Sequence, residues 1–353
     1  MEEHAGREFD RGRPSEEYVV SDDQADIPAE ESLEPTLLPE NPYASPREPV
    51  APPWEPDGSP CEPIGPSWEQ GVSRRRPRVW TVWLVFVLSA FVNLGGVVAV
   101  LIGLVVWEYG PETLASRRFG DALREVSTSL VGLLITVSWT MVVFFVTAVA
   151  AAALSPVDWR ERLRFRPARI SAFGVGIHVC GVLAIGLVFG ALLELGILPQ
   201  SPSLAELTDL ITGLSGGALW AVVLVIGIAP GIAEELLFRG YIQTRFSRRW
   251  GPGWGVLWTA LLFGVMHFDF IHGVFAFALG VYLGYLTEWT GSIVPAMICH
   301  AANNTYQTLA TAWGFDVTGD AANVAGLLVG VLVLGLSIWH LRARVKPKGS
   351  DPS

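Results

Sequence analysis

The chain has 353 residues, of which 51% are hydrophobic and 16% are charged, and its mean hydropathy is +0.41. This composition is typical of a protein that crosses a membrane several times, and it excludes an ordinary soluble enzyme. The net charge of −10 is unevenly spread, because most acidic residues precede Arg74 and the remainder is mildly basic. The division indicates an acidic tail attached to a membrane domain and argues against nucleic-acid binding.

Cysteine and glycine patterns argue against disulfide-rich, CxxC metal-binding and nucleotide-binding proteins. The three cysteines, Cys61, Cys180 and Cys299, form no CxxC metal pattern and no disulfide framework. We expect Cys180 and Cys299, which fall in apolar segments, to be buried as small apolar residues. No Walker or dinucleotide-binding glycine loop occurs, so no small-molecule cofactor is expected.

Residues 1–72 are rich in proline, acidic and small polar residues and lack a periodic apolar face. We therefore expect a disordered tail on the cytoplasmic side, and no cleaved signal peptide. Residues 73–345 are predicted to form a transmembrane helical domain, with its core over 217–312, and residues 346–353 a C-terminal tail. The fold class is thus all-α, a polytopic membrane protein with about eight transmembrane helices.

Eight segments are apolar enough to span a membrane, and each must be helical because lipid offers no hydrogen-bond partners to the backbone. Closely spaced glycines, such as Gly280 with Gly284 and Gly326 with Gly330, are expected to let helices approach closely. The predicted spans are Val79–Val106, Ser127–Leu154, Ala172–Leu198, Gly217–Phe238, Trp254–Phe268, Gly273–Trp289, Ser292–Ala312 and Ala321–His340.

Basic residues cluster in alternate loops, which predicts the orientation of the spans. Loops on the other side carry acids, around Glu206–Asp209 and Asp316–Asp320. Both termini are therefore expected to be cytoplasmic, in a bacterial cytoplasmic membrane. The basic positions are Arg74–Arg78, then Arg160, Arg162, Arg164, Arg166 and Arg169, then Arg245, Arg248 and Arg249, and finally Arg342, Arg344, Lys346 and Lys348.

The fourth predicted span ends in two adjacent carboxylates and an arginine. Glu235 and Arg239 are four residues apart with the acid on the N-terminal side, which is the favourable order for a helical ion pair. Glu234 has no such partner, and burial disfavours its charged form, which suits a group that takes up and releases a proton. We interpret Glu235 and Arg239 as a positioning pair and Glu234 as the reactive carboxylate.

Two further spans carry polar groups: His267 in the fifth, and His300 with Asn304 on one face of the seventh. A lone histidine in a membrane helix is more often a hydrogen-bond partner between helices, but three helices with such groups favour a shared site. His272, expected in the turn after the fifth span, and His340, at the end of the eighth, are predicted to be interfacial.

Two peptide-hydrolysing chemistries fit these residues. In the first, Glu234 and His267 deprotonate a water while His300 and Asn304 donate to the oxyanion. In the second, Glu234, His267 and His300 ligate Zn²⁺. The absence of HExxH and the idle role left for Asn304 favour the metal-free chemistry. Either one requires the side chains of Glu234, His267, His300 and Asn304 to meet in a cavity open to the cytoplasm, with a tilted or displaced fifth helix.

The set Glu234-Glu235-x-x-x-Arg239, Phe263-x-x-x-His267 and His300-x-x-x-Asn304 resembles the CAAX protease and bacteriocin-processing (Abi) family of intramembrane proteases, relatives of the type II CAAX prenyl protease. The resemblance covers roughly residues 217–312. It implies an eight-helix bundle, a water-filled cavity and endopeptidase activity. The family's motif glutamate, histidines and asparagine fall on Glu234, His267, His300 and Asn304. The family is conventionally classed as metalloproteases, so the resemblance leaves Zn²⁺ as an alternative cofactor.

The resulting hypothesis is a multi-pass endopeptidase that acts at the lipid bilayer on a peptide or membrane-protein substrate. The alternative is a non-catalytic immunity or scaffold protein that keeps the polar bundle for fold specificity. A transporter is a third possibility, although no inverted repeat points to it. The presence of all four polar residues favours the enzyme.

Overall fold

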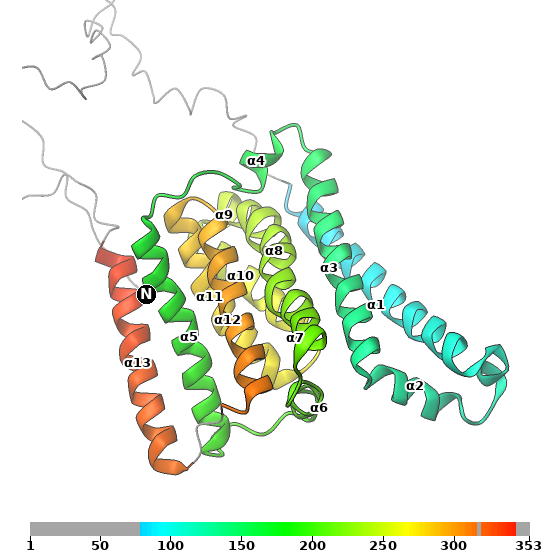
Figure 1. Cartoon of the computed structure of the whole chain (residues 1–353). Helices are drawn as coiled ribbons and strands as arrows, with labels where there is room; N and C mark the ends of the chain where they lie inside the picture. Colours follow the sequence, from blue (N-terminus) through cyan, green and yellow to red (C-terminus); the bar gives the residue numbers. More distant parts are fainter. Residues whose placement is uncertain (1–77, 316–318, 344–353) are drawn as a thin grey trace, which may run out of the picture. The chain divides into compact units, whose positions relative to one another are not determined.

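A computed structural model describes residues 78–315 and 319–343. Helices joined by short connections make up this part of the chain, and it contains no strand (Figure 1). The all-α prediction is confirmed. The predicted tails 1–72 and 346–353 lie outside the described residues.

The helices vary widely in length, and several short ones were not predicted, among them α2, α4 and α6. In chain order they are α1 (Trp80–Tyr109), η1 (Pro111–Ala115), α2 (Phe119–Ser127), α3 (Leu130–Ala153), α4 (Trp159–Arg162), α5 (Ala172–Glu194), α6 (Pro202–Ile211), α7 (Gly216–Val222), η2 (Val223–Ile228), α8 (Ala229–Glu235), η3 (Leu236–Gln243), α9 (Thr244–Trp250), α10 (Pro252–Val265), α11 (Phe270–Thr290), α12 (Val294–Trp313) and α13 (Asp320–Ala343).

Six helical stretches are long and apolar enough to cross a membrane: α1, α3, α5, the continuous stretch Gly216–Trp250, α11 and α13. The outward faces of α1 and α13 expose large apolar side chains such as Phe91, Leu328 and Leu332. All eight predicted spans are helical, but α10 has only 14 residues and α12, with 20, is more polar. The protein is an integral, multi-pass membrane protein.

The predicted end of the fourth span at Phe238 is wrong. The chain stays helical from Gly216 to Trp250, and two stretches within it, η2 and η3, have π-helical hydrogen bonding. The helix continues because protein, rather than lipid, surrounds its polar residues: Arg239 is fully buried and Arg245 is 8% exposed. Glu234 therefore lies in the interior of a long helix. π-Helical turns of this kind are frequent at functional sites.

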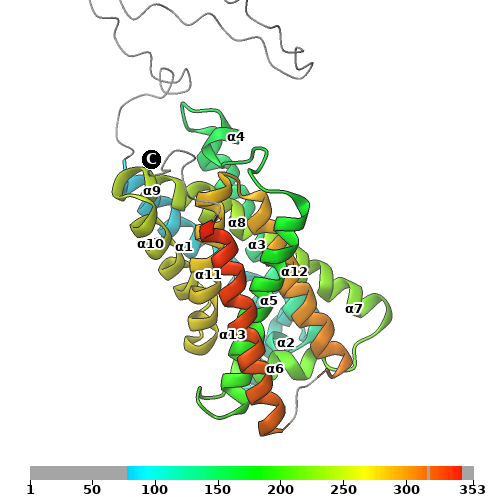
Figure 2. The same ribbon diagram turned by 90° about the vertical axis from the view of Figure 1, so that its left-hand side faces the viewer.

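Close helix contacts assemble the bundle. Helices α5 and α13 lie side by side, and α1 lies against α3 (Figures 1 and 2). The predicted role of the glycine pairs is confirmed, since a Cβ at Gly330 would lie 3.2 Å from the Ala184 carbonyl of α5, and one at Gly280 would lie 3.1 Å from the Ala260 Cβ of α10. Small residues thus set the spacing of the helices.

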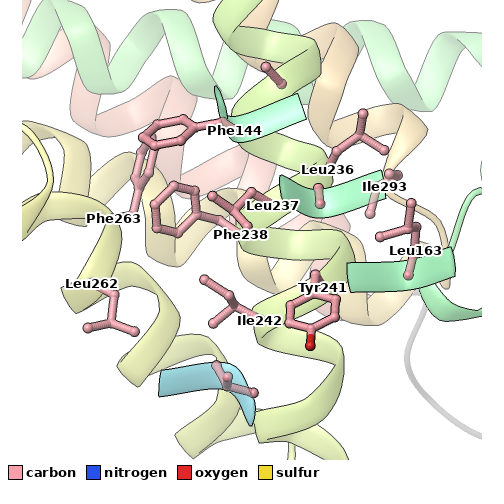
Figure 3. Packing of buried hydrophobic residues seen from close by; sticks show 14 of the residues in the cluster. Phe144, Leu163, Leu236, Leu237, Phe238, Tyr241, Ile242, Leu262, Phe263 and Ile293 are labelled. Carbon is pink, nitrogen blue, oxygen red and sulfur yellow. The ribbon is translucent and has the colours of Figure 1, made fainter. Parts of the chain in front are cut away.

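An apolar core surrounds the central helix (Figure 3). The Phe238 ring meets the edges of Phe144 and Phe263, with ring centroids 6.0 Å and 5.0 Å apart. Leu237 and Ile242 are fully buried beside it. This core lies next to the acidic residues of α8 and excludes water from one side of them.

Candidate active site

Two glycines bring the acidic helix against α12. A Cβ at Gly231 would lie 2.7–2.9 Å from the backbone and Cβ of Ala301, and one at Gly227 would lie 2.8 Å from Oγ1 of Thr305. The spacing Gly227-x-x-x-Gly231 is a small-xxx-small pattern of helix contact. Sequence reasoning missed this pair, although the pattern was there to find. The close approach places Glu234 and Glu235, one turn further on, against His300.

Glu235 joins the two helices chemically. Its Oε1 accepts a hydrogen bond from Arg239 Nη1 at 2.6 Å and lies 2.8 Å from His300 Nδ1. Both Glu235 and Arg239 are fully buried, and the guanidinium of Arg239 lies 4.4 Å from the centroid of the Phe263 ring. The predicted ion pair therefore forms. The sequence did not show that the same carboxylate would also orient His300.

His300 stands between the two carboxylates. Its Nδ1 faces Glu235, and its Nε2 lies 3.8 Å from Glu234 Oε2. Donation to Glu235 requires a proton on Nδ1. The distance of 3.8 Å is too long for a direct hydrogen bond. It is compatible with one water between Glu234 and His300.

His267 follows the end of α10 and does not lie inside a longer fifth span as predicted. The backbone turns sharply after it, since Phe268 has a φ of 53°. His267 Nδ1 donates to the Phe263 carbonyl at 2.8 Å, which leaves Nε2 as an acceptor. The Phe263 ring meets both His267 and His300 edge-on, with centroids 5.0 Å and 5.9 Å apart. Phe263 therefore links the two histidines.

A capping residue fixes the connection that carries His267. Asp269 accepts from the backbone N–H of His272 at 2.7 Å, from Ser201 Oγ at 2.7 Å and from Ser203 Oγ at 2.6 Å. The backbone hydrogen bond first, and then the two hydroxyls, lower the pKa of Asp269 to about 2. His272 lies in the first turn of α11, with its ring 4.4 Å from that of His267, and not in the preceding turn as expected. Sequence reasoning missed Asp269, although an aspartate before an apolar run is typical of a helix N-cap.

Asn304 ties α12 to the π-helical stretch η2. Its Nδ2 donates to the Ile226 carbonyl at 3.4 Å, four residues before Pro230, whose nitrogen has no hydrogen to donate. Asn303, which was not predicted, donates from Nδ2 to Asn304 Oδ1 at 3.1 Å. One N–H of Asn304 stays free for another acceptor. The two asparagines therefore hold η2 at the level of His300.

We call Glu234, Glu235, Arg239 and His300 the acidic cluster. A second buried group, the neutral cluster, consists of His178, Tyr282, Ser337 and His340 from α5, α11 and α13. His178 Nδ1 lies 2.7 Å from Tyr282 Oη and 3.2 Å from Ser337 Oγ, Tyr282 contacts Ser337, and His340 Nδ1 lies 3.4 Å from His178 Nε2. Sequence reasoning missed His178, whose ring lies 5.3 Å from that of His340, and the interfacial position of His340 stays a prediction.

Of the two predictions of buried cysteines, one is confirmed and one is wrong. Cys299 is fully buried, as expected. Cys180 is exposed on α5, so its predicted burial is wrong. Apolar periodicity does not tell which face of a uniformly apolar helix meets protein and which meets lipid, and α5 is apolar on all sides.

The residues of this site do not fit a metal ion well. Within 78–315 and 319–343, no three His, Cys, Asp or Glu side chains are grouped so that they could hold one. Glu235 and the Nδ1 of His300 are engaged with each other. The predicted zinc set of Glu234, His267 and His300 therefore gains no support from this geometry, and we derive no step through a metal.

Comparison with known proteins identifies the region around the site. Residues 216–306 match the family model described as type II CAAX prenyl endopeptidase Rce1-like. The resemblance predicted from the motifs is confirmed. The Rce1-like segment contains Glu234, Glu235, Arg239, His267, His300 and Asn304, and the family is one of intramembrane CAAX-type proteases.

One curated relative adds to this match. The chain is 28% identical over 177 residues to the uncharacterized protein YpbD of Bacillus subtilis (strain 168). The aligned region covers 46% of this chain and 80% of YpbD. No solved structure matches the chain. The Rce1-like segment includes all of the acidic cluster but only Tyr282 of the neutral cluster.

Proposed function

We propose that the protein is an intramembrane endopeptidase that hydrolyses a peptide bond in a membrane-associated protein or peptide, as in CAAX-like or leader processing. One observation carries the proposal: His300 lies between Glu235, which orients it, and Glu234, whose Oε2 lies 3.8 Å from its other nitrogen. A buried acid this close to an imidazole can act on a water while the imidazole donates to the oxyanion that forms beside it. The Rce1-like match supports the same reaction class.

The proposed reaction begins with a water held by Glu234 and His267. Glu234 takes one proton of this water as the oxygen attacks the peptide carbonyl carbon, and the second hydrogen stays on that oxygen and donates a hydrogen bond to the free Nε2 of His267. The tetrahedral intermediate then collapses. The C–N bond breaks, and Glu234 returns its proton to the leaving amine.

His300 and Asn304 are proposed to stabilise the oxyanion of the intermediate. His300 keeps its Nδ1 proton on Glu235 and, when Nε2 is also protonated, donates that second proton toward the oxyanion. Asn304 has one N–H to spare after donating to Ile226. Arg239 holds Glu235 in place and does not touch the reacting atoms.

Profiling of protein N-termini tests this proposal while the substrate is still unidentified. Membranes from cells expressing the parent protein or Glu234→Gln would be compared by mass spectrometry for new N-termini. Termini present only with the parent support proteolysis, and they also identify the substrate. Identical profiles, with both proteins present at equal levels, would favour the immunity or scaffold alternative.

The purified protein and the substrate found in this way then test the metal question. Cleavage that survives chelation, with no stoichiometric metal in elemental analysis, supports the metal-free reaction. Loss of cleavage that Zn²⁺ alone restores would support the zinc alternative.

We propose that the basic segments face the cytoplasm of a bacterial cell, with both termini on that side. Arg248 Nη2 and Glu161 Oε1 are 3.3 Å apart, so the α4 loop and the end of α9, both basic, share one side of the bundle. Such segments are retained on the cytoplasmic side. Reporter fusions after Arg169 and Arg249 should read cytoplasmic and one after Glu206 external, whereas an external reading at Arg249 would reverse the assignment.

A further inference from the structure

The basic connection between α3 and α5 is folded into a defined hollow. The rings of Trp159 and Phe165 stack with centroids 6.0 Å apart, and the guanidinium of Arg160 lies 5.3 Å from the Trp159 ring centroid. Around these rings lies a surface hollow of about 640 Å³, also lined by Arg166 and Pro167. A loop whose basic residues only set the orientation of the helices in the membrane would not need a hollow of this kind.

Positive charge in this hollow is poorly balanced. Arg164 pairs with Glu288 at 2.9 Å, but no acid among residues 78–315 and 319–343 pairs with Arg160, Arg166 or Arg169. Burial first, and then the neighbouring charges of Arg164 and Arg169, lower the pKa of Arg166. A bound anion would relieve this repulsion.

The two acids on the wall of the hollow are already engaged. Asp158 accepts from the backbone N–H of Arg160 at 2.9 Å, and Glu161 lies 3.3 Å from Arg248. The wall of the hollow itself carries two acids and two arginines, but the connection 158–169 as a whole has five arginines against these two acids, a formal charge of +3.

A second hollow, of about 610 Å³, adjoins the first, since Trp159 and Asp158 line both. Its walls are mostly apolar and include Phe145, Val149 and Leu163. Phe145 and Val149 belong to α3 and are 46% and 41% exposed, so the groove opens on the side where α3 presents apolar side chains outward. An arginine-lined hollow beside an apolar groove, with a tryptophan between them, matches the division of a phospholipid into headgroup and acyl chain.

We propose that this pair of hollows binds one acidic phospholipid, with its phosphate at Arg160 and Arg166 and an acyl chain along Phe145 and Val149. The occupant is a membrane lipid because the arginine-bearing hollow shares Trp159 and Asp158 with an apolar groove on a membrane-spanning helix. A free phosphate would use only the first hollow, and a zwitterionic lipid would gain nothing from the unbalanced arginines.

The site connects to the start of α12. Arg166 Nε donates to the Gly291 carbonyl at 2.7 Å, Ser292 Oγ donates to the Arg166 carbonyl at 2.6 Å, and the Ile293 N–H donates to the Arg164 carbonyl at 3.2 Å. α12 begins at the next residue and carries His300. Lipid bound at Arg166 therefore stabilises the end of α12 that leads to the acidic cluster, and it should raise the melting temperature of the protein.

Native mass spectrometry of the delipidated full-length protein tests the site, with phosphatidylglycerol, phosphatidylcholine and inorganic phosphate as separate probes. We expect one tightly held phosphatidylglycerol, whose affinity falls about thirtyfold in Arg160→Gln/Arg166→Gln because two juxtamembrane charges are lost. The matched control is Arg117→Gln/Arg118→Gln, which removes two exposed arginines from the connection between α1 and α2. Its affinity should equal that of the parent.

Two further variants keep the test decisive. Arg160→Gln alone leaves the Arg166–Gly291 hydrogen bond intact and should still weaken phosphatidylglycerol binding, which separates a binding effect from a folding effect. Val149→Trp fills the apolar groove and should displace the lipid while both arginines remain. Three results would overturn the proposal: phosphatidylcholine binds as well as phosphatidylglycerol, the control pair loses as much affinity, or Val149→Trp binds the lipid as the parent does. Binding of inorganic phosphate without phosphatidylglycerol would show an adventitious ion only and would also overturn it.

Discussion

The acidic cluster and the neutral cluster are both buried between helices, but they differ in charge and in hydrogen-bond completeness. In the described part of the chain, buried polar atoms without a partner include Glu235 Oε2 and both Nε and Nη2 of Arg239, whereas none belongs to the neutral cluster. Unpaired buried polar atoms cost free energy, and some residues outside both clusters, such as Gln243 and Thr287, have them as well. We propose that the acidic cluster serves the reaction and the neutral cluster serves packing, and this difference supports the proposal.

The position of each cluster in the chain agrees with this difference. The acidic cluster lies entirely within the Rce1-like segment, while His178, Ser337 and His340 lie outside it. The neutral cluster joins α5 to α13, which lie side by side (Figure 1). Variants that affect activity and stability separately can therefore test the comparison.

The largest expected effect is on activity, in Glu234→Gln. The amide keeps the shape of the side chain but cannot take a proton, so the initial rate of cleavage should fall about 10²–10⁴-fold. The melting temperature should stay close to that of the parent. Rates are measured on the substrate identified from N-terminal profiling. Full activity in a well-folded Glu234→Gln protein would mean that the acidic cluster does not carry the reaction.

Arg239→Ala should have the largest effect on stability. It leaves Glu235 as a buried charge that His300 alone can balance, at a cost of about 3–5 kcal/mol. Denaturant unfolding in detergent measures this loss. The control is Arg249→Ala, which removes an exposed arginine from the same helix. Equal stability of the two variants would mean that the pair does not hold Glu235 in place.

Gly231→Ala should disturb the acidic cluster without removing any of its chemical groups. Its Cβ would meet Ala301 at 2.7–2.9 Å, so α8 and α12 must separate, at a cost of about 1–3 kcal/mol. The rate of cleavage should fall with the loss of stability because Glu234 moves away from His300. Gly217→Ala is the matched control, since a Cβ there meets nothing within 4 Å. Unchanged activity in Gly231→Ala would show that this contact does not position the site.

The smallest effect is expected in the neutral cluster, for Tyr282→Phe. Removing the hydroxyl takes one hydrogen bond from His178, which can still bond to Ser337, so unfolding should become easier by about 0.5–1.5 kcal/mol. The cleavage rate should remain within about twofold of the parent. A loss of activity comparable to that of Glu234→Gln would assign the neutral cluster a catalytic role. The proposed difference in role between the two clusters would then be wrong.

Local patterns in the sequence determined the helices and part of the site. Long apolar runs must be helical in lipid, so the all-α class followed directly. The pairing of Glu235 with Arg239 needs only a spacing of four residues on one helix. The polar motifs around His267, His300 and Asn304 were also readable, because polar groups in apolar segments are rare and are retained for a reason.

Tertiary structure decided everything that depends on contact between helices. Placing His300 between Glu234 and Glu235 requires that Gly231 meet Ala301, and the neutral cluster joins His178 to Ser337 and His340, which are 159 and 162 residues away in the sequence. Which face of α5 exposes Cys180, and how far the central helix continues beyond Phe238, depend on the neighbours that cover them. An apolar run shows that a helix can be buried, but only packing against a particular partner determines which of its sides meets protein and which meets lipid.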